Sequence, residues 1–173
     1  MNRLIFITGG ARCGKSGFAV TSAEKTGGTL TYIATASPGD PEMAARIERH
    51  KMLRGDCWKT VEEQLDLPRV FSEIPAGGTV VVDCLTLWLT NLIMASGDDF
   101  EGVSRDKAQW LAEALKGYDG TVFVVSNEVG MGIVPGNEMA RIFRDAAGTV
   151  NRIIAGAADE AYLVVAGLPV KLK

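Results

Sequence analysis

Residues 9–16 read G-G-A-R-C-G-K-S and are suited to holding the phosphates of a nucleotide. They match the pattern G-x-x-x-x-G-K-[ST], in which glycines let the chain wrap closely around a phosphate. Successive backbone N–H groups would point inward, and the helix that follows would add its positive dipole end. We expect Lys15 to reach the β and γ oxygens and the Ser16 hydroxyl to join a bridging Mg²⁺. The sequence therefore predicts a site for a nucleoside triphosphate with magnesium.

An acidic residue stands where such a site needs one. Asp83 closes the apolar run Thr79–Val82. Enzymes with this phosphate loop place an acid at the end of a neighbouring strand to hold magnesium. Aspartate is also a good helix cap, and a helical pattern begins at Leu85. The two roles are compatible, and we favour the magnesium or nucleotide role.

The only histidine of the chain, His50, lies within a predicted helix, Pro41–Arg54. Helical spacing places Arg46, His50 and Arg54 on one face. A neutral imidazole among fixed cations can attack phosphorus while the cations hold the phosphates. A solvated basic helix with an incidental histidine is the commoner explanation for such a segment taken alone.

These residues need elements to position them, and the hydrophobic pattern supplies candidates. Five apolar, partly β-branched runs predict buried strands: Leu4–Thr8, Leu30–Ala36, Thr79–Cys84, Thr121–Ser126 and Ala161–Ala166. Besides Pro41–Arg54, helical periodicity predicts helices over Lys15–Lys25, Leu85–Ala95, Val103–Leu115 and Asn137–Ala158. Near-continuous apolar strands that alternate with helices indicate an α/β fold, a mostly parallel sheet with helices on both faces.

The end of the chain adds a feature to this sheet. Gly167–Pro169 is followed by a second alternating run, Val170–Lys173, which predicts a C-terminal edge strand or hairpin. No internal repeat, low-complexity tract or long linker divides the sequence. We therefore expect a single nucleotide-binding domain over residues 1–173.

Composition excludes several classes of protein. The formal net charge is −3 over 173 residues, so there is no global basic surface for nucleic acid or for an anionic membrane. The longest apolar stretch, Val80–Ala95, is interrupted by Asp83, and we expect no membrane span. Cys13, Cys57 and Cys84 form no CxxC pair, which indicates neither a disulfide framework nor a zinc ribbon. A reducing, cytoplasmic compartment is the expectation.

The sequence resembles the bifunctional adenosylcobinamide kinase / adenosylcobinamide-phosphate guanylyltransferase family of cobalamin biosynthesis. Five blocks carry the resemblance: 9–16, Tyr32–Thr35 (Y-I-A-T), Glu42–Glu62 around His50, Asp83–Leu92 (D-C-L-T-L-W-L-T-N-L) and Val125–Lys173, which includes N-E-V-G-M-G-I-V-P. The phosphate loop alone is shared with many enzymes. The histidine segment and the N-E-V-G-M-G-I-V-P loop together are specific to this family.

The resemblance implies two reactions. In one, ATP or GTP gives its γ-phosphate to the aminopropanol hydroxyl of adenosylcobinamide. In the other, GTP guanylylates a histidine, matched here by His50, and the GMP passes to adenosylcobinamide phosphate to form adenosyl-GDP-cobinamide. The resemblance further implies a RecA-like P-loop NTPase fold, a homotrimer, and a corrinoid held by the Glu128–Glu138 loop and partner subunits.

Site residues follow from the same resemblance. It implies His50 as the catalytic residue, while the phosphate-loop pattern itself gives Ser16 and Asp83 as the metal-binding residues. The implied nucleotide contacts are Gly9, Gly10, Ala11, Arg12, Cys13, Gly14, Lys15, Ser16, Ile33, Ala34, Thr35, Lys51, Met52, Leu53, Arg54, Glu62 and Asp83. Cys13 replaces the serine that is usual in the phosphate loop, a position that contributes mainly its backbone N–H.

Two other functions remain compatible with the phosphate loop. One is a P-loop kinase of small molecules without nucleotidyl transfer, and the other is a RecA-type nucleotide-binding module without catalysis. Neither of them needs His50 or the arginines around it. The role of His50 therefore distinguishes the three hypotheses.

Overall fold

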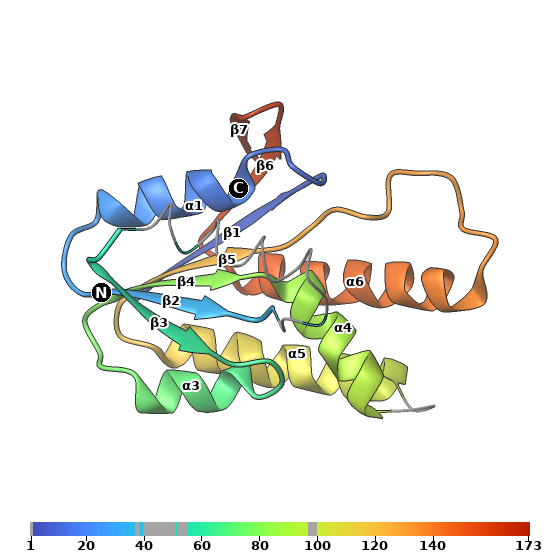
Figure 1. The fold of residues 1–173 in the computed structure, drawn as a ribbon, viewed down its shortest axis with the longest axis horizontal. Coiled ribbons are helices and arrows are strands. Elements are labelled where there is room, and N and C mark those ends of the chain that lie inside the picture. Colours follow the sequence, from blue (N-terminus) through green and yellow to red (C-terminus); the bar gives the residue numbers. More distant parts are fainter. Residues whose placement is uncertain (1, 37–38, 40–50, 52–54, 97–99) are drawn as a thin grey trace.

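The structure is a computed structural model, and it describes residues 2–36, 39, 51, 55–96 and 100–173. Within these residues a seven-stranded sheet has the order β3-β2-β4-β5-β1-β6-β7 (Figure 1). The elements, in chain order, are β1 (Arg3–Gly9), α1 (Lys15–Glu24), β2 (Leu30–Ala34), β3 (Trp58–Glu62), α3 (Leu67–Glu73), β4 (Thr79–Asp83), α4 (Leu85–Ser96), α5 (Phe100–Gly117), β5 (Thr121–Val125), α6 (Glu138–Ala157), β6 (Glu160–Val165) and β7 (Leu168–Lys171).

The sheet is covered on both faces because its central strands carry apolar side chains on both of their faces. In β5, Val122 and Val124 join a core cluster with residues of α5 and α6, such as Leu111. The alternate residues Phe123 and Val125 join a second cluster with α1. Figure 1 shows α1 on one side of the sheet and α3 and α5 on the other. The predicted α/β architecture is confirmed.

The strand order determines which residues meet at the carboxyl edge of the sheet. The strands from β3 to β6 are parallel, so their carboxyl ends share one edge. Strand β5 lies between β1 and β4, and its register pairs Val125 with Ile7 on one side and with Asp83 on the other. Segments that are distant in sequence therefore converge above the end of β5.

The predicted C-terminal hairpin is confirmed. Strand β7 pairs antiparallel with β6 at the edge of the sheet. The two turn residues, Ala166 and Gly167, have positive φ angles of 50° and 82°. Positive φ at both central positions is the mark of a tight two-residue hairpin turn, whose twist matches that of the strands.

The five predicted strands all form, each within two residues of its expected bounds. The helix predicted over Val103–Leu115 is longer and runs from Phe100 to Gly117. Two elements were not predicted, β3 and α3. The predicted helix Pro41–Arg54 lies outside the described residues apart from Lys51.

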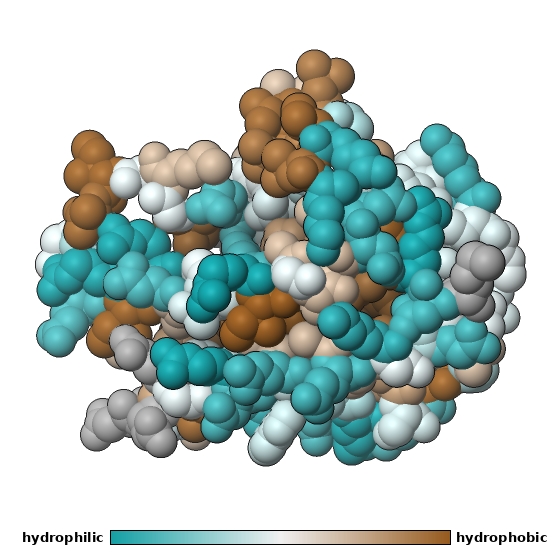
Figure 2. Space-filling model, turned by 180° about the vertical axis from the view of Figure 1, so that it is seen from behind, coloured by the Kyte–Doolittle hydropathy of each residue, from teal (hydrophilic) through white to brown (hydrophobic). Residues whose placement is uncertain are grey.

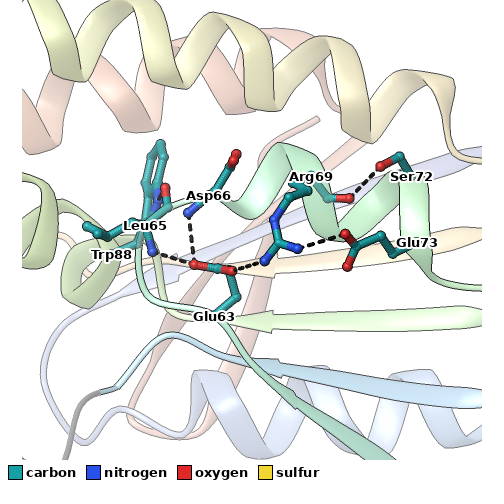
Figure 3. Close-up of polar contacts among 7 residues, drawn as sticks. All are labelled: Glu63, Leu65, Asp66, Arg69, Ser72, Glu73 and Trp88. Carbon is teal, nitrogen blue, oxygen red and sulfur yellow. Dashed lines mark hydrogen bonds and ion pairs between the residues drawn. The ribbon is translucent and has the colours of Figure 1, made fainter.

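The junction between β3 and α3 is held by a polar cluster (Figure 3). The Glu63 carboxylate accepts bonds from the backbone N–H groups of Leu65 and Asp66 and from Arg69, each at 2.9 Å. Burial alone would raise the pKa of Glu63, but these donors lower it below its ordinary value. The indole N–H of Trp88 donates to the Leu65 carbonyl at 3.0 Å, which ties the same turn to α4.

Exposed large apolar side chains gather on two segments. Figure 2 shows brown surface over the β6–β7 hairpin and over the loop between β5 and α6. The residues concerned are Val165, Leu168, Val170 and Leu172 on the hairpin and Val129, Met131, Ile133 and Val134 on the loop. Within the described part of the chain, no helix combines the length and apolarity needed to cross a membrane.

A charged cluster joins β1, β6 and β7 at the amino end of the parallel strands. Glu160, at the start of β6, accepts hydrogen bonds from Tyr162 at 2.6 Å and from Arg3, and it forms an ion pair with Lys171 at 3.1 Å. The bonds from Tyr162 and Arg3 outweigh the effect of burial and lower the pKa of Glu160 to about 2. The cluster thus couples β1, β6 and β7.

The charge of Glu160 should make folding stability depend on pH. The ordinary pKa is 4.5 and the folded value about 2, so the unfolded chain binds more protons between these pH values. The contribution is therefore complete above pH 4.5 and is lost as the pH falls toward 2. We expect Glu160→Gln to lower the free energy of unfolding at neutral pH by about 1–2 kcal/mol, after solvent screening of the half-exposed cations.

Urea unfolding of both proteins from pH 2 to 7 measures this difference. Glu73→Gln is the matched control, because Glu73 pairs with Arg69 in an exposed i,i+4 geometry worth under about 0.5 kcal/mol. A Glu160→Gln deficit that stays constant across the whole pH range would contradict the assignment.

Candidate nucleotide-binding site

The phosphate loop joins β1 to α1 at the carboxyl edge of the sheet. Strand β1 ends at Gly9 and α1 begins at Lys15. The first intrahelical bond runs from the Phe18 N–H to the Gly14 carbonyl at 3.0 Å, so the N–H groups of the first helical residues have no partner within the helix. Gly14 has φ 98°, a left-handed conformation that favours glycine. The loop therefore presents backbone donors and a helix N-terminus to one point.

The loop is fixed by the strand and hairpin beside it. A Cβ atom at Gly9 would lie 2.4 Å from the Val164 carbonyl oxygen of β6, so only glycine fits there. The N–H of Gly167, in the β6–β7 turn, donates to the Cys13 carbonyl at 2.9 Å. A Cβ atom at Gly14 would approach the Gly167 Cα to 3.3 Å. The C-terminal hairpin is therefore part of the support of the phosphate loop.

The side chains of the loop differ in their exposure and contacts. Lys15 is 7% exposed, and its ammonium group donates to the Gly10 carbonyl at 3.0 Å, across the loop. Ser16 is half-buried, whereas Ala11 and Arg12 are exposed. The Lys15 ammonium group is thus held against the backbone of the loop, next to the N-terminus of α1.

Asp83 lies at the carboxyl end of β4, as expected, but its strand is not the immediate neighbour of β1. Strand β5 lies between them, and Asp83 is level with Ile7 through Val125. Two strand spacings correspond to about 10 Å, a gap that a phosphate and a hydrated cation can span. Tyr32 donates its hydroxyl hydrogen to Asp83 Oδ2 at 2.7 Å. Tyr32 therefore orients the carboxylate.

Thr35 has a structural task beside Asp83. Its buried hydroxyl donates to the Cys84 carbonyl and accepts from the Cys84 N–H, both at 2.8 Å. Its own N–H donates to the Asp83 carbonyl at 3.2 Å, and its carbonyl accepts from Asn91 at 2.8 Å. Ile33 is buried in the core. Hydrogen bonds therefore join the carboxyl end of β2 to the residues that follow β4.

The donor set near the loop suits a hard cation that retains oxygen ligands from phosphate and water. Ser16 offers a hydroxyl and Asp83 a carboxylate. Among the described residues no three His, Cys, Asp or Glu side chains converge to form a metal cage. Magnesium commonly binds through one or two protein oxygens plus phosphates and waters, so these residues fit it.

Two of the predicted nucleotide-binding residues, Lys51 and Glu62, are in contact at the β3 edge of the sheet. Lys51 forms an ion pair of 3.3 Å with Glu62 at the end of β3. Strand β3 is four strand positions from β1, or about 19 Å. His50, Met52, Leu53 and Arg54 lie outside the described residues.

Two asparagines that were not predicted from the sequence form hydrogen bonds at the carboxyl end of β5, the strand between β1 and β4. Asn127, just after β5, donates to the Thr86 hydroxyl at 2.6 Å. Asn151 of α6 donates to the Asn127 carbonyl at 3.1 Å and accepts from Ser126 at 2.6 Å. The S-N run directly after an apolar strand was the available signal, since carboxyl ends of parallel strands carry ligand contacts.

Comparison with solved structures identifies the type of fold. One solved ATPase domain matches with a TM-score of 0.57 at 11% identity, covering 94% of this chain and 69% of that one. A DnaB-like replicative helicase, in a structure describing its interactions with primase, matches with a TM-score of 0.54 at 11% identity, covering 93% of this chain and 46% of that one. At such identity the likeness shows the fold alone. Fold and phosphate loop together define a P-loop protein of RecA-like architecture.

Sequence comparison identifies the family. The model for cobinamide kinase / cobinamide phosphate guanyltransferase matches residues 5–172, and the chain belongs to this family. The bifunctional adenosylcobalamin biosynthesis protein CobP of Pseudomonas aeruginosa is 44% identical over 168 residues, 96% of this chain and 95% of that protein. CobU of Salmonella typhimurium is 42% identical over 182 residues, 98% of this chain and 99% of that protein. The predicted kinase and guanylyltransferase class is confirmed.

Replacing Tyr32 with phenylalanine should weaken the orientation of Asp83 while leaving the fold intact. The ring is buried and packs edge-on against Trp58, so the loss of one hydrogen bond should cost about 1 kcal/mol of stability. We expect the Mg²⁺ concentration for half-maximal nucleotide binding to rise about tenfold, as for other residues that orient a metal ligand. Titration of nucleotide binding with Mg²⁺ measures this.

Tyr118→Phe is the matched control. Tyr118 is also buried, and its hydroxyl donates to the Pro75 carbonyl at 2.8 Å, away from the phosphate loop. Equal Mg²⁺ dependence in Tyr32→Phe and Tyr118→Phe would show that Tyr32 does not position Asp83.

Proposed function

We propose that the chain catalyses two successive reactions on a corrinoid. In the first, ATP or GTP donates its γ-phosphate to the aminopropanol hydroxyl of adenosylcobinamide. In the second, His50 takes GMP from GTP and passes it to adenosylcobinamide phosphate, which gives adenosyl-GDP-cobinamide. The observation that carries the proposal is the phosphate loop between β1 and α1, in a chain whose residues 5–172 match this family.

For the first reaction, the loop backbone and the α1 N-terminus would bind the phosphates, and Lys15 would bind the β and γ oxygens. Mg²⁺, held by the Ser16 hydroxyl and the Asp83 carboxylate, would neutralise charge on the same phosphates. The hydrogen bond from Tyr32 orients the Asp83 carboxylate, and the hydrogen bond from Thr35 holds the backbone next to Asp83. The resulting preorganised charge is the main contribution that a protein makes to phosphoryl transfer.

In the second reaction, an imidazole nitrogen of His50 would attack the α-phosphorus of GTP. An N–P bond forms, the bond from the α-phosphorus to the bridging oxygen breaks, and pyrophosphate leaves. A phosphate oxygen of adenosylcobinamide phosphate then attacks the same phosphorus, and the N–P bond breaks to restore the imidazole. Lys51, which is next to His50 in sequence, pairs with Glu62 and so connects this segment to the end of β3.

Labelling with GTP that carries radioactive α-phosphorus tests the proposal. We expect the wild type to acquire a label that is acid-labile and base-stable, and His50→Ala to acquire none. Arg105→Ala, an exposed position on α5, is the control and should be labelled like the wild type. An unlabelled wild type that binds GTP would leave the kinase without nucleotidyl transfer, or the RecA-type binding module.

We further propose a cytoplasmic homotrimer. All three cysteines are described and none forms a disulfide, which supports a reducing compartment. The exposed apolar residues of the loop between β5 and α6 support self-association, because monomeric proteins rarely expose contiguous apolar patches. Ile133 is 98% exposed and Met131 80%.

Charged substitutions in this loop should weaken the assembly. We expect the double variant Met131→Glu, Ile133→Glu to shift the sedimentation coefficient from trimer to monomer at micromolar concentration, because charges would be buried at the contact. Met94→Glu, another exposed methionine on α4, should leave the trimer intact. A monomeric wild type, or a double variant that remains trimeric, would contradict the proposal.

A further inference from the structure

The chain that leaves β5 runs directly along the phosphate loop. The Ser126 N–H donates to the Ile7 carbonyl and the Glu128 N–H to the Gly9 carbonyl, both at 2.9 Å. These bonds continue the pairing of β5 with β1 past the last paired residues, Ile7 and Val125. Glu128 is therefore anchored beside the first glycine of the phosphate loop, with the end of β4 and Asp83 on the other side of β5.

The Glu128 carboxylate is available for chemistry at this point. It is half-buried, and its Oε1 accepts one hydrogen bond, from the Gly130 N–H at 2.7 Å. A carboxylate has about four acceptor positions, so one such bond leaves capacity for another donor. Within the described part of the chain no cation pairs with Glu128, whereas Glu62 pairs with Lys51 and Glu63 with Arg69.

Phosphoryl transfer to an alcohol requires removal of a proton from the acceptor hydroxyl, and kinases use a positioned carboxylate for this task. Ser16 and Asp83 are assigned to the cation, and the donors around Glu63 lower its pKa and make it a poor base. Glu128 follows the carboxyl end of β5, the strand between β1 and β4, so its backbone lies between the phosphate loop and the end of β4, where a γ-phosphate and its acceptor would meet.

We propose that Glu128 is the general base of the phosphoryl-transfer reaction, an inference that rests on the proposed kinase function. The acceptor hydroxyl gives its proton to a Glu128 carboxylate oxygen while its own oxygen forms a bond to the γ-phosphorus. The bond between that phosphorus and the oxygen bridging to the β-phosphate breaks, and the nucleoside diphosphate leaves. The proton on Glu128 is later released to solvent.

The second reaction supplies an internal control. Guanylylation of a histidine uses the lone pair of a neutral imidazole nitrogen, and pyrophosphate leaves as an anion, so no hydroxyl has to lose a proton. Glu128 should therefore matter for phosphorylation of the corrinoid and not for labelling of the protein by GTP.

The test compares Glu128→Gln, Glu128→Ala and the matched control Glu113→Gln, which replaces an exposed glutamate on α5. Glutamine keeps an acceptor oxygen for the Gly130 N–H but is not a base. We expect Glu128→Gln to lower kcat for phosphorylation of adenosylcobinamide about 10²- to 10⁴-fold. The KM for nucleotide and the α-phosphorus labelling should change less than about threefold. Formate should restore part of the kcat of Glu128→Ala, because a free carboxylate can replace the missing base.

Each other result has a distinct meaning. A Glu128→Gln variant with wild-type kcat, beside an impaired Glu128→Ala variant that formate does not rescue, would make Glu128 an anchor of the loop and overturn the inference alone. Parallel loss of phosphorylation and of labelling would also overturn it, since the site as a whole would be disturbed. A wild type that phosphorylates no corrinoid would overturn the kinase proposal and this inference together.

Discussion

The backbone of the phosphate loop is held from both sides of β1. On one side the chain after β5 continues the pairing to the Gly9 carbonyl, and on the other the β6–β7 turn binds the Cys13 carbonyl. Close approach of the Val164 carbonyl excludes any Cβ atom at Gly9. Backbone N–H groups bind phosphate more tightly when they do not have to reorganise, and the neighbouring strands hold them in place here. The remaining site residues are arranged around this fixed point.

Much of this architecture could be predicted from the sequence because its main signals are local. A glycine pattern between an apolar strand and a helix defines the phosphate loop, and runs such as Thr121–Val125 identify strands buried on both faces. Strand β3 was missed because only Trp58 among its five residues is buried, so its pattern resembles a polar loop. Helix α3 was missed because seven residues with a proline near the start give too little periodicity.

The parts of the site that could not be predicted depend on strand order. Hydrophobic periodicity places Tyr32 within one strand and Asp83 at the end of another, but it does not show that those strands are adjacent, so their hydrogen bond had no signal in the sequence. The interposition of β5 between β1 and β4 is a fact of the same kind. It creates the gap that Asn127 and Glu128 border.

The hydrogen bond between Gly167 and Cys13 has a consequence for how the protein folds during its synthesis. Ribosomes add about 5–20 residues per second and domains generally fold as units. The phosphate loop leaves the ribosome well before the hairpin that supports it. A nascent chain therefore carries the complete glycine motif for a long part of its synthesis without the support that shapes it. We therefore expect nucleotide binding to require that β6 and β7 have first packed against the loop.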